Sequence, residues 1–585
     1  MRRAAVTLFV CLLVAGRFSS AQDRLNEKID RIFAGWNTTS SPGCALAVVK
    51  DGRIVYEHGY GMANLELGVA ITPQSVFDIG SVSKQITAMA IILLTQDGKL
   101  SLDDDMRKYL PEIPDYGSRI TIRHLLHHTS GLRNYDDLFD LEGIPEADLT
   151  TDRDAMDLIV RQKGVNFKPG EEFLYSDTNF FLMSQIVKRI TGQTLRQFAQ
   201  ERIFGPLGMT STHFHDDHTM IVARRATGYA PRKGGGFEID MSNFEQLGDG
   251  SVMTTVEDLY KWEHNFDDPL VGGREAIHQL TTPGTLNNGQ PIPYGMGLFI
   301  DRYRGLNWIH HSGEWVGYRA ALSRFPDQHF STLITCNCVG SMNPMTMAEQ
   351  VADVYLANEL AKAEKMSSAQ SGTAMPAATL RQYAGTYWSE KNGALRKFMV
   401  RDGKLVMEAP GITYDMVPVG DGQFEAVEPD SEHKDRYVFR TAGTGSALQL
   451  EAWEGGAPAI YEAVKGPVPE ASRLADYAGA YTNDELRATW TLVVQNGKLI
   501  RQQWITEDEE LEPAFTDGFI GDLSEGQFLI HFNRDRANHV TDFDVSTDMV
   551  RPMKFIKVAN GAAQNRFPVS RNGEGKNASG AGERP

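Results

Sequence analysis

An internal repeat constrains the C-terminal third of this chain of 585 residues. The segment LRQYAGTY at Leu380 returns as LADYAGAY at Leu474, and DGKL at Asp402 returns as NGKL at Asn496. Both pairs are 94 residues apart, so the two copies keep one register. Each copy is rich in strand and turn signals and poor in helix signals, which favours a small antiparallel β-barrel. The repeat therefore predicts two consecutive barrel domains.

The region before the repeat mixes strand and helix signals. CALAVVKDGRIVYEHGYG, from Cys44, predicts two strands joined by a turn at Asp51-Gly52. Strand signals return in GLNWIHHSGEWVGYRAALSRFPDQHFSTLITCNC, from Gly305, and a helix is expected through 347–361. Strands at both ends with helices between them predict an α+β domain whose sheet is closed by its two terminal segments.

Shifts in composition separate these parts. AEKMSSAQSGTAMPAA is a small-residue linker, GPVPEAS lies between the two repeat copies, and the last residues are rich in Gly, Asn, Arg and Ala. The predicted order is a signal peptide (1–21), an α+β domain (22–362), a linker (363–378), two β-barrel domains (379–466 and 470–558) and a disordered tail (559–585).

The N-terminus has the pattern of a signal peptide. Arg2 and Arg3 precede an apolar stretch at 4–16, and SSA before Gln22 is a small-residue cleavage site. The stretch is too short to cross a bilayer, so we expect a periplasmic or secreted protein without a transmembrane anchor. The net charge of −18 and the lack of a basic run argue against nucleic-acid binding. The sequence carries no signal for an oligomeric state.

Three cysteines remain after removal of the signal peptide: Cys44, Cys336 and Cys338. In an oxidising compartment Cys44 can form one disulfide with either of the other two. Three cysteines are too few for a disulfide scaffold, so buried free thiols are an equal alternative.

A serine and a lysine begin a long apolar helix in FDIGSVSKQITAMAIILLTQDGKL. Apolar residues three and four apart predict the helix, and Ile91 and Ile92 predict that it is buried nearly all round. Ser81 and Lys84 share one face at its start. The same S-x-x-K pattern at Ser431 lies in a polar stretch, so context distinguishes the two. A buried lysine next to a serine suggests a base that takes the proton of a nucleophile.

Two further segments give this pair its meaning. FKPGEEFLYSDTNF places Tyr175 and Asp177 in a loop after a Pro-Gly turn, and IHHSGEWVGY places His311 at the end of an expected strand. With SVSK, these segments resemble the three motifs of the serine β-lactamase and penicillin-binding-protein superfamily. The form of the three motifs resembles that found in class C β-lactamases, D-aminopeptidases, D-alanyl-D-alanine carboxypeptidases and related esterases. The resemblance covers about 25–360 and includes LLHHTSGL, IFGPLGMTSTHF, GDGSVMTTVEDL and YGMGLFI.

The resemblance implies a serine hydrolase that forms an acyl-enzyme and needs no cofactor or metal. Ser81 would be the nucleophile, and Lys84 and Tyr175 would jointly carry protons. The backbone N–H groups of Ser81 and Glu314 would form the oxyanion hole, and His311 would form a hydrogen bond near Tyr175 and hold its position. The substrate-binding residues implied in this way are Asp177, His311, Ser312, Gly313 and Glu314.

Two positions depart from the superfamily pattern. Asp177 stands where asparagine is usual, and its carboxylate should favour a charged Lys84 or bind a substrate amine. His311 replaces the lysine that pairs with a β-lactam carboxylate. Both changes argue against efficient β-lactamase action. We expect a peptidase for peptides containing D-amino acids, of the D-aminopeptidase or D-alanyl-D-alanine carboxypeptidase type. An esterase or weak β-lactamase is the first alternative, and a penicillin-recognising binding protein without turnover is the second.

A rival site is HFHDDH, 213–218, which fits the H-x-H-x-D-H signature of metallo-β-lactamase-fold hydrolases. It lacks the strand leading in and the further ligands that such a fold needs, so a surface loop is expected. His127 and His128, within LLHHTSGL, are interpreted as part of a structural turn. The barrels carry no nucleophile–base pattern, and architecture like that of D-aminopeptidases implies that they close over the active site. The acidic segments Val427–Asp435 and Thr506–Pro513 would reach the cleft or form solvated loops.

Overall fold

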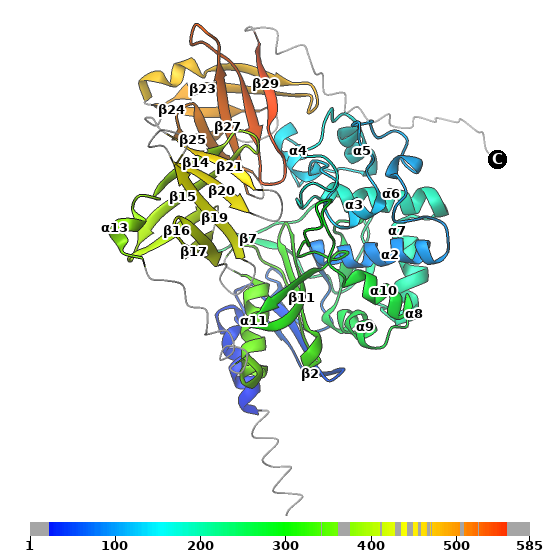
Figure 1. The fold of residues 1–585 in the computed structure, drawn as a ribbon. Helices are drawn as coiled ribbons and strands as arrows, with labels where there is room; N and C mark the ends of the chain where they lie inside the picture. Colours follow the sequence, from blue (N-terminus) through cyan, green and yellow to red (C-terminus); the bar gives the residue numbers. More distant parts are fainter. Residues whose placement is uncertain are drawn as a thin grey trace, which may run out of the picture.

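The computed structural model describes residues 23–340, 342–360, 375–409, 412–427, 434–441, 448–453, 458–464, 469, 471–503, 508–523 and 526–558. Figure 1 shows one large mixed domain, with its sheet and helical layer side by side, and two barrels at one end of the molecule. The predicted signal peptide, most of the linker and the C-terminal tail lie outside the described residues. No described helix combines the length and apolar character needed to cross a bilayer.

A six-stranded antiparallel sheet, in the order β10-β11-β12-β13-β1-β2, forms the centre of the large domain. Strand β1 pairs with β13, so the first and last strands of the domain lie side by side, as predicted. Asp51 and Gly52 form the tight turn between β1 and β2 with positive φ angles of 50° and 71°. The strands are β1 (Cys44–Lys50), β2 (Arg53–Tyr60), β10 (Phe299–Tyr303), β11 (Leu306–Trp315), β12 (Tyr318–Phe325) and β13 (Phe330–Cys336).

Both faces of this sheet are covered. Alternate residues of β1 belong to two separate apolar clusters: Leu46 packs in the cluster of α11 (Pro344–Tyr355), and Ala47 packs in the cluster of the helical layer. Because side chains alternate between the faces of a strand, a strand covered on both sides is apolar along its whole length. This explains the unbroken run CALAVV.

Helix α2 (Lys84–Gln96) lies at the centre of the helical layer (Figure 1). It continues from a short 3-10 turn, η2 (Gly80–Ser83), and every side chain from Lys84 to Leu94 is buried, which confirms the predicted burial. The other α-helices of the domain are α3 (Ile122–Leu126), α4 (Tyr135–Glu142), α5 (Asp152–Val160), α6 (Asp177–Thr191), α7 (Leu195–Ala199), α8 (Gly205–Leu207), α9 (Val256–Asp267) and α10 (Gly273–Leu280).

Short strands and 3-10 or π turns complete the domain. The strands are β3 (Met62–Asn64), β4 (Val69–Ala70), β5 (Phe77–Asp78), β6 (His213–Phe214), β7 (Tyr229–Pro231), β8 (Phe237–Ile239) and β9 (Val252–Thr254). The turns are η1 (Ala34–Trp36), η3 (Met106–Lys108), η4 (Gln200–Phe204) and η5 (Pro326–Gln328).

Two closed antiparallel barrels of eight strands follow, as the repeat predicted. A short helix, α13 (Ala377–Leu380), precedes the first barrel: β14 (Gly385–Ser389), β15 (Ala394–Arg401), β16 (Lys404–Ala409), β17 (Ile412–Gly420), β18 (Gln423–Val427), β19 (Lys434–Thr441), β20 (Leu448–Trp453) and β21 (Ala459–Ala463). The turn η6 (Ala471–Asp476) precedes the second: β22 (Gly479–Asn483), β23 (Ala488–Gln495), β24 (Lys498–Gln502), β25 (Glu509–Phe515), β26 (Gly518–Asp522), β27 (Gln527–Arg534), β28 (Val540–Ser546) and β29 (Met553–Val558).

The repeat is also visible in hydrogen bonds. In the first barrel the Tyr387 hydroxyl donates to the carbonyl of Tyr383 at 3.0 Å, and in the second Tyr481 donates to the carbonyl of Tyr477 at 2.8 Å. These are the tyrosines of YAGTY and YAGAY, so the repeated letters form the same buried contact in both barrels.

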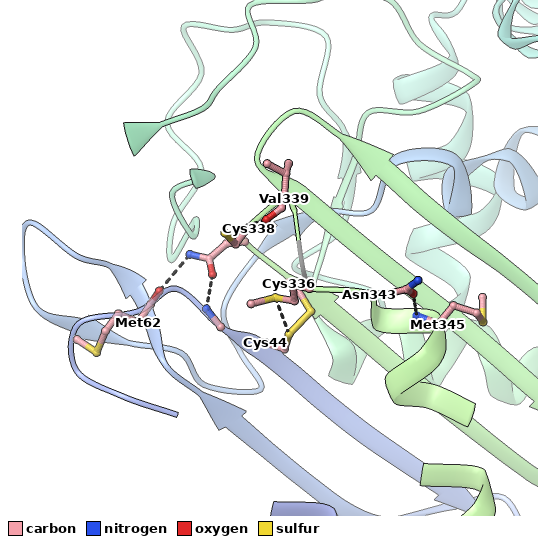
Figure 2. The surroundings of a disulfide bond; sticks show 10 residues. Cys44, Met62, Cys336, Cys338, Val339, Asn343 and Met345 are labelled. Atoms are coloured by element: carbon pink, nitrogen blue, oxygen red, sulfur yellow. Dashed lines mark hydrogen bonds between the residues drawn. A yellow bond between two sulfur atoms is a disulfide. The ribbon is translucent and has the colours of Figure 1, made fainter. Parts of the chain in front are cut away.

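Cys44 and Cys336 form a disulfide across β1 and β13 (Figure 2). The two residues are paired directly in the sheet register. Cys338, beyond the end of β13, is a buried free thiol whose pKa burial raises to about 11. The structure thus confirms the disulfide alternative, with Cys336 as the partner of Cys44, and leaves the third thiol free.

Candidate active site

Ser81 and Lys84 lie where the 3-10 turn η2 passes into α2. The buried Lys84 Nζ is 2.8 Å from Ser81 Oγ, 2.5 Å from Asp177 Oδ1 and 2.7 Å from the carbonyl oxygen of Asp249. The carboxylate and the carbonyl can only accept hydrogen bonds, whereas a hydroxyl can donate or accept. An uncharged Lys84 can therefore donate to the Asp177 carboxylate and the Asp249 carbonyl, and it can take the proton of Ser81 without moving.

Two glycines allow the nucleophile to approach strand β11. A Cβ on Gly80, whose φ is +48°, would lie 2.7 Å from the backbone nitrogen of Glu314. A Cβ on Gly313 would lie 1.9 Å from the carbonyl oxygen of Ile79. The backbones around Ser81 and Glu314 therefore meet, which is the arrangement that two oxyanion-hole donors require. Ser312 is exposed beside them.

Tyr175 lies just before Ser176, the N-cap residue of α6, and its ring packs over Lys84. Its ring centroid is 4.9 Å from Lys84 Nζ. Its buried hydroxyl has no well-aligned hydrogen bond among the described residues. Burial, followed by the charge of Asp177, raises the pKa of this phenol well above its usual value, and the interaction with Ser81 only partly opposes this effect. Tyr175 therefore stays protonated and is suited to donate a proton to a leaving group.

His128 packs against the ring of Tyr175. Its imidazole stacks on Tyr175 with ring centroids 4.2 Å apart. The backbone N–H of Ser176 donates to His128 Nδ1 at 3.1 Å, so the hydrogen of the neutral ring is on Nε2. Burial, assisted by the charge of Lys84, holds the pKa of His128 well below its usual value. The interpretation of His128 as part of a structural turn missed this contact with Tyr175.

His311 forms no hydrogen bond with Tyr175 itself among the described residues. It does form one beside Tyr175, with the hydroxyl of Tyr294, whose ring centroid is 6.2 Å from that of Tyr175. His311 lies inside β11 rather than at its end, because this strand continues through Trp315. Its Nε2 accepts from the Tyr294 hydroxyl at 3.1 Å and its Nδ1 donates to the Ser312 carbonyl at 2.6 Å. Burial and the charge of Lys84 lower the pKa of His311 to about 3, so it supplies no cation to the site.

Three carboxylates lie next to Lys84. One oxygen from each of Asp136, Asp177 and Asp249 lies within 4.8 Å of the others. Tyr135 donates to Asp249 Oδ2 at 2.9 Å, whereas Asp249 Oδ1 and Asp136 Oδ1 are buried and accept no hydrogen bond from the described residues. Burial and the charge of Asp177 raise the pKa of Asp249 to about 7, and the same two causes raise that of Asp136 well above its usual value. Such a group can bind one cation.

These side chains line a cavity of about 290 Å³ that contains Ser81 and Tyr175. One wall is aromatic, with the rings of Phe244 and Trp315 4.8 Å apart. No lysine or arginine is among the described residues that line it. Its acidic residues are Asp136, Asp137, Asp140, Glu146, Asp177, Asp249 and Glu314. The cavity therefore favours cationic substrates and disfavours anionic ones.

The second barrel reaches this cavity through the loop between β28 and β29. Met549 lines the cavity, and the Thr547 hydroxyl donates to Asp137. Arg551 pairs with Glu172 at 2.5 Å. Of the two acidic segments proposed for this role, one does not reach the cleft in its described part, and the other lies mostly outside the described residues. Within the described part of Thr506–Pro513, residues 509–513 belong to strand β25 and none lines the cavity, while most of Val427–Asp435 lies outside the described residues.

The histidine run at 213–218 does not converge on one point. His218 Nδ1 lies 2.7 Å from Glu245, and these two residues with Asp217 can bring ligand atoms together. His213 lies on β6 and His215 just beyond it, and neither belongs to this group. The H-x-H-x-D-H signature is therefore not assembled as a metallohydrolase site within the described residues.

Comparisons with known proteins identify the family of the chain. The Beta-lactamase family model matches residues 29–357. A D-aminopeptidase of Brucella canis is 25% identical over 537 residues, which cover 88% of this chain and 96% of that protein. A D-aminopeptidase of Gluconobacter oxydans is 30% identical over 381 residues, covering 64% of this chain and 68% of that protein.

The solved structure of an octameric penicillin-binding protein homologue from Pyrococcus abyssi has a similar fold. Its TM-score is 0.52 at 23% identity, over 75% of this chain and 99% of that one. Since the family model matches more than half of its length, the chain belongs to the Beta-lactamase family and is a serine hydrolase.

Proposed function

We propose that this protein is an exported hydrolase that cleaves amides and short peptides of D-amino acids whose amino group is free. The cavity carries this proposal, because its nucleophile lies beside three carboxylates and its described lining contains no lysine or arginine. The similarity to proteins named D-aminopeptidase supports the substrate class. Export is supported by the signal-peptide pattern of the first residues.

In the proposed reaction Ser81 Oγ attacks the carbonyl carbon while its proton passes to Lys84 Nζ. The negative oxygen of the tetrahedral intermediate accepts hydrogen bonds from the backbone N–H groups of Ser81 and Glu314. Tyr175 donates a proton to the leaving nitrogen as the C–N bond breaks, and Lys84 returns a proton to Tyr175. Water then attacks the resulting ester by the reverse proton route and releases the acid.

Other activities of the same site are less well supported. A D-alanyl-D-alanine carboxypeptidase or β-lactamase needs a cation for the substrate carboxylate, and the neutral His311 provides none. Esters remain the first alternative. Their carbonyl groups would use the same nucleophile and oxyanion hole, and they have better leaving groups than amides. A penicillin-recognising protein without turnover would keep the cavity but would not release product.

The test begins with Ser81→Ala, which should abolish both hydrolysis and labelling by a fluorescent phosphonate. Ser431→Ala, at the second S-x-x-K match, is the control and should behave as the wild type. Amides of D- and L-amino acids, muropeptide fragments, short esters and a chromogenic cephalosporin then define the substrate class. Turnover by Ser81→Ala near the wild-type rate, or a preference for L-amides or cephalosporin, would refute the proposal.

A further inference from the structure

We propose that Asp136, Asp177 and Asp249 together bind the primary ammonium group of the substrate, an inference that rests on the proposed function. One oxygen of each residue lies within 4.8 Å of the other two. An ammonium nitrogen that donates three hydrogen bonds of about 2.8 Å in tetrahedral directions requires acceptors about 4.6 Å apart. The upper limit of 4.8 Å on these separations thus admits one primary ammonium group.

The hydrogen-bonding state of these carboxylates points to a missing donor. Oδ1 of Asp136 and Oδ1 of Asp249 are buried and accept nothing from the described residues. Lys84 cannot supply a further donor, because its three contacts are with Ser81, Asp177 and the Asp249 carbonyl. A buried carboxylate oxygen without a donor is costly, and a charged donor removes that cost. A substrate ammonium group provides three such donors.

The titratable groups around the triangle support an exchange of protons for the amine. Burial and mutual repulsion raise the pKa of both Asp136 and Asp249. Lys84, Tyr135, Asp137 and Tyr175 also face the group, and Lys84 is the one basic side chain among these four. Without a ligand, protons reduce the repulsion. With a ligand bound, the ammonium charge takes over that role.

The position of the triangle selects an α-amino group. Asp177 and the Asp249 carbonyl both contact Lys84 Nζ, which in turn lies 2.8 Å from Ser81 Oγ. An α-amino group is separated from the scissile carbonyl carbon by one carbon atom. When the carbonyl carbon is at Ser81 Oγ, the α-amino group therefore also lies near Ser81, as the triangle does. An N-acylated residue offers one neutral N–H in place of three charged ones. It would leave buried carboxylate oxygens unpaired, which is an effective way to reject a ligand.

The experiment compares D-alanine p-nitroanilide with its N-acetyl form on the full chain. The wild type should prefer the free amine in kcat/KM by about 100-fold or more. Asp136→Asn and Asp249→Asn should each lower that preference by about tenfold, since each removes one charged acceptor. Glu146→Gln removes a charge from the same cavity outside the triangle and should change the preference less than twofold. Asp177 is left intact because it also holds Lys84.

Phosphonate labelling of Ser81 shows that each variant is folded. An unchanged preference in both Asn variants, or an equal change in Glu146→Gln, would overturn the inference. Loss of activity with a chelator and its return with Mg²⁺ or Ca²⁺ would also overturn it, because a metal would then occupy the triangle.

If the wild type hydrolyses neither anilide, the proposed function fails and the triangle is tested separately. D-Alaninol, which has the amine but no scissile bond, should then protect wild-type Ser81 from the phosphonate. The concentration needed should rise about tenfold in Asp136→Asn, and equal protection in both proteins would overturn the inference.

Discussion

The two barrels have the same topology and a common repeat, yet they differ in what they contact. The buried apolar side chains of the second barrel are continuous with the core of the α+β domain, whereas those of the first form a separate cluster. Figure 1 shows β29 of the second barrel on the side of α4 and α5. The comparison teaches that a duplicated fold acquires its role through the side chains on its outer surface.

One repeat position illustrates the difference. Trp490 of the second barrel and Arg396 of the first are 94 residues apart, as are the paired tyrosines. Trp490 is fully buried and its Nε1 donates to the carbonyl of Leu141, near the end of α4, at 3.1 Å. The guanidinium of Arg396 instead lies over Tyr461 of its own barrel at 5.5 Å.

The second barrel therefore holds α4 at both ends. Trp490 binds the carbonyl of Leu141 at one end, and Thr547 binds Asp137 at the other. Asp136, which carries one oxygen of the ammonium triangle, lies beside Asp137 on the first turn of the helix. The second barrel is thus a positioning element for the substrate-binding wall of the cavity.

The largest expected effect comes from Trp490→Ala. Removal of a fully buried tryptophan should lower the free energy of unfolding by about 3–5 kcal/mol. Arg396→Ala, at the matching position of the first barrel, should cost less than about 1 kcal/mol. Chemical denaturation of both variants checks this. Equal losses would show that the two barrels support the molecule in the same way.

Thr547→Val should have a smaller effect that depends on pH. Burial raises the pKa of Asp137 to about 7, although the hydrogen bonds from Asn134 and Thr547 oppose this shift. The raised pKa makes the protonated form the more stable one, so this group's contribution to stability is present below about pH 4 and is lost as the pH rises through 7.

Above pH 7 the ionised Asp137 relies on the Thr547 hydroxyl. The valine variant should therefore lose about 1.5–3 kcal/mol at pH 8, and the difference should shrink as Asp137 becomes protonated towards pH 5. Thermal unfolding at the two pH values measures it. A loss of the same size at both would mean that Asp137 is not the group that titrates.

Met549→Gly tests whether the second barrel restricts the cavity. Met549 is the one residue of the described barrels that lines it. Its removal should raise kcat/KM for bulky D-amino acid amides about tenfold relative to D-alaninamide, because the added space corresponds to roughly 1.4 kcal/mol of binding. An unchanged ratio would remove Met549 from substrate selection.

Truncation after Lys365 would remove both barrels at once. The shared core and the Trp490 contact now predict that this truncation would expose a large apolar surface of the α+β domain. The single substitution at Met549 therefore tests the closing of the cavity more directly than the removal of both barrels.

The fold and the centre of the site were open to prediction because they depend on local patterns. The repeat predicted the barrels, and the three-residue spacing of Ser81 and Lys84 placed them at one helix start. Tyr175 was identified because its segment, FKPGEEFLYSDTNF, resembles a motif of the superfamily. None of these predictions required knowledge of distant contacts.

The rest of the site depends on contacts between distant segments. Three of the missed residues occur in phrases that were recognised without a role: His128 in LLHHTSGL, Asp249 in GDGSVMTTVEDL and Tyr294 in YGMGLFI. All three segments belong to the resemblance to the superfamily. This shared membership was the available signal that their polar residues converge. Asp136 and Met549 had no such signal, because only packing of α4 and of the second barrel brings them to the cavity.

The smallest expected effect belongs to the contact of the first barrel with the α+β domain. Glu172 accepts from Arg551 of the second barrel at 2.5 Å and from Lys391 of the first at 3.3 Å. The Arg551 side chain is 15% exposed and that of Lys391 is 78% exposed, so solvent screens the lysine pair far more strongly.

Lys391→Ala should therefore change the free energy of unfolding by no more than about 0.5 kcal/mol, and kcat/KM by less than twofold. Arg551→Ala is the matched variant and should cost about 1.5–3 kcal/mol, because it leaves the mostly buried Glu172 without its close partner. It should also weaken binding of D-alaninamide, since the loop that carries Thr547 and Met549 loses an attachment. If Lys391→Ala has the larger effect on either measurement, the first barrel rather than the second controls this wall of the cavity.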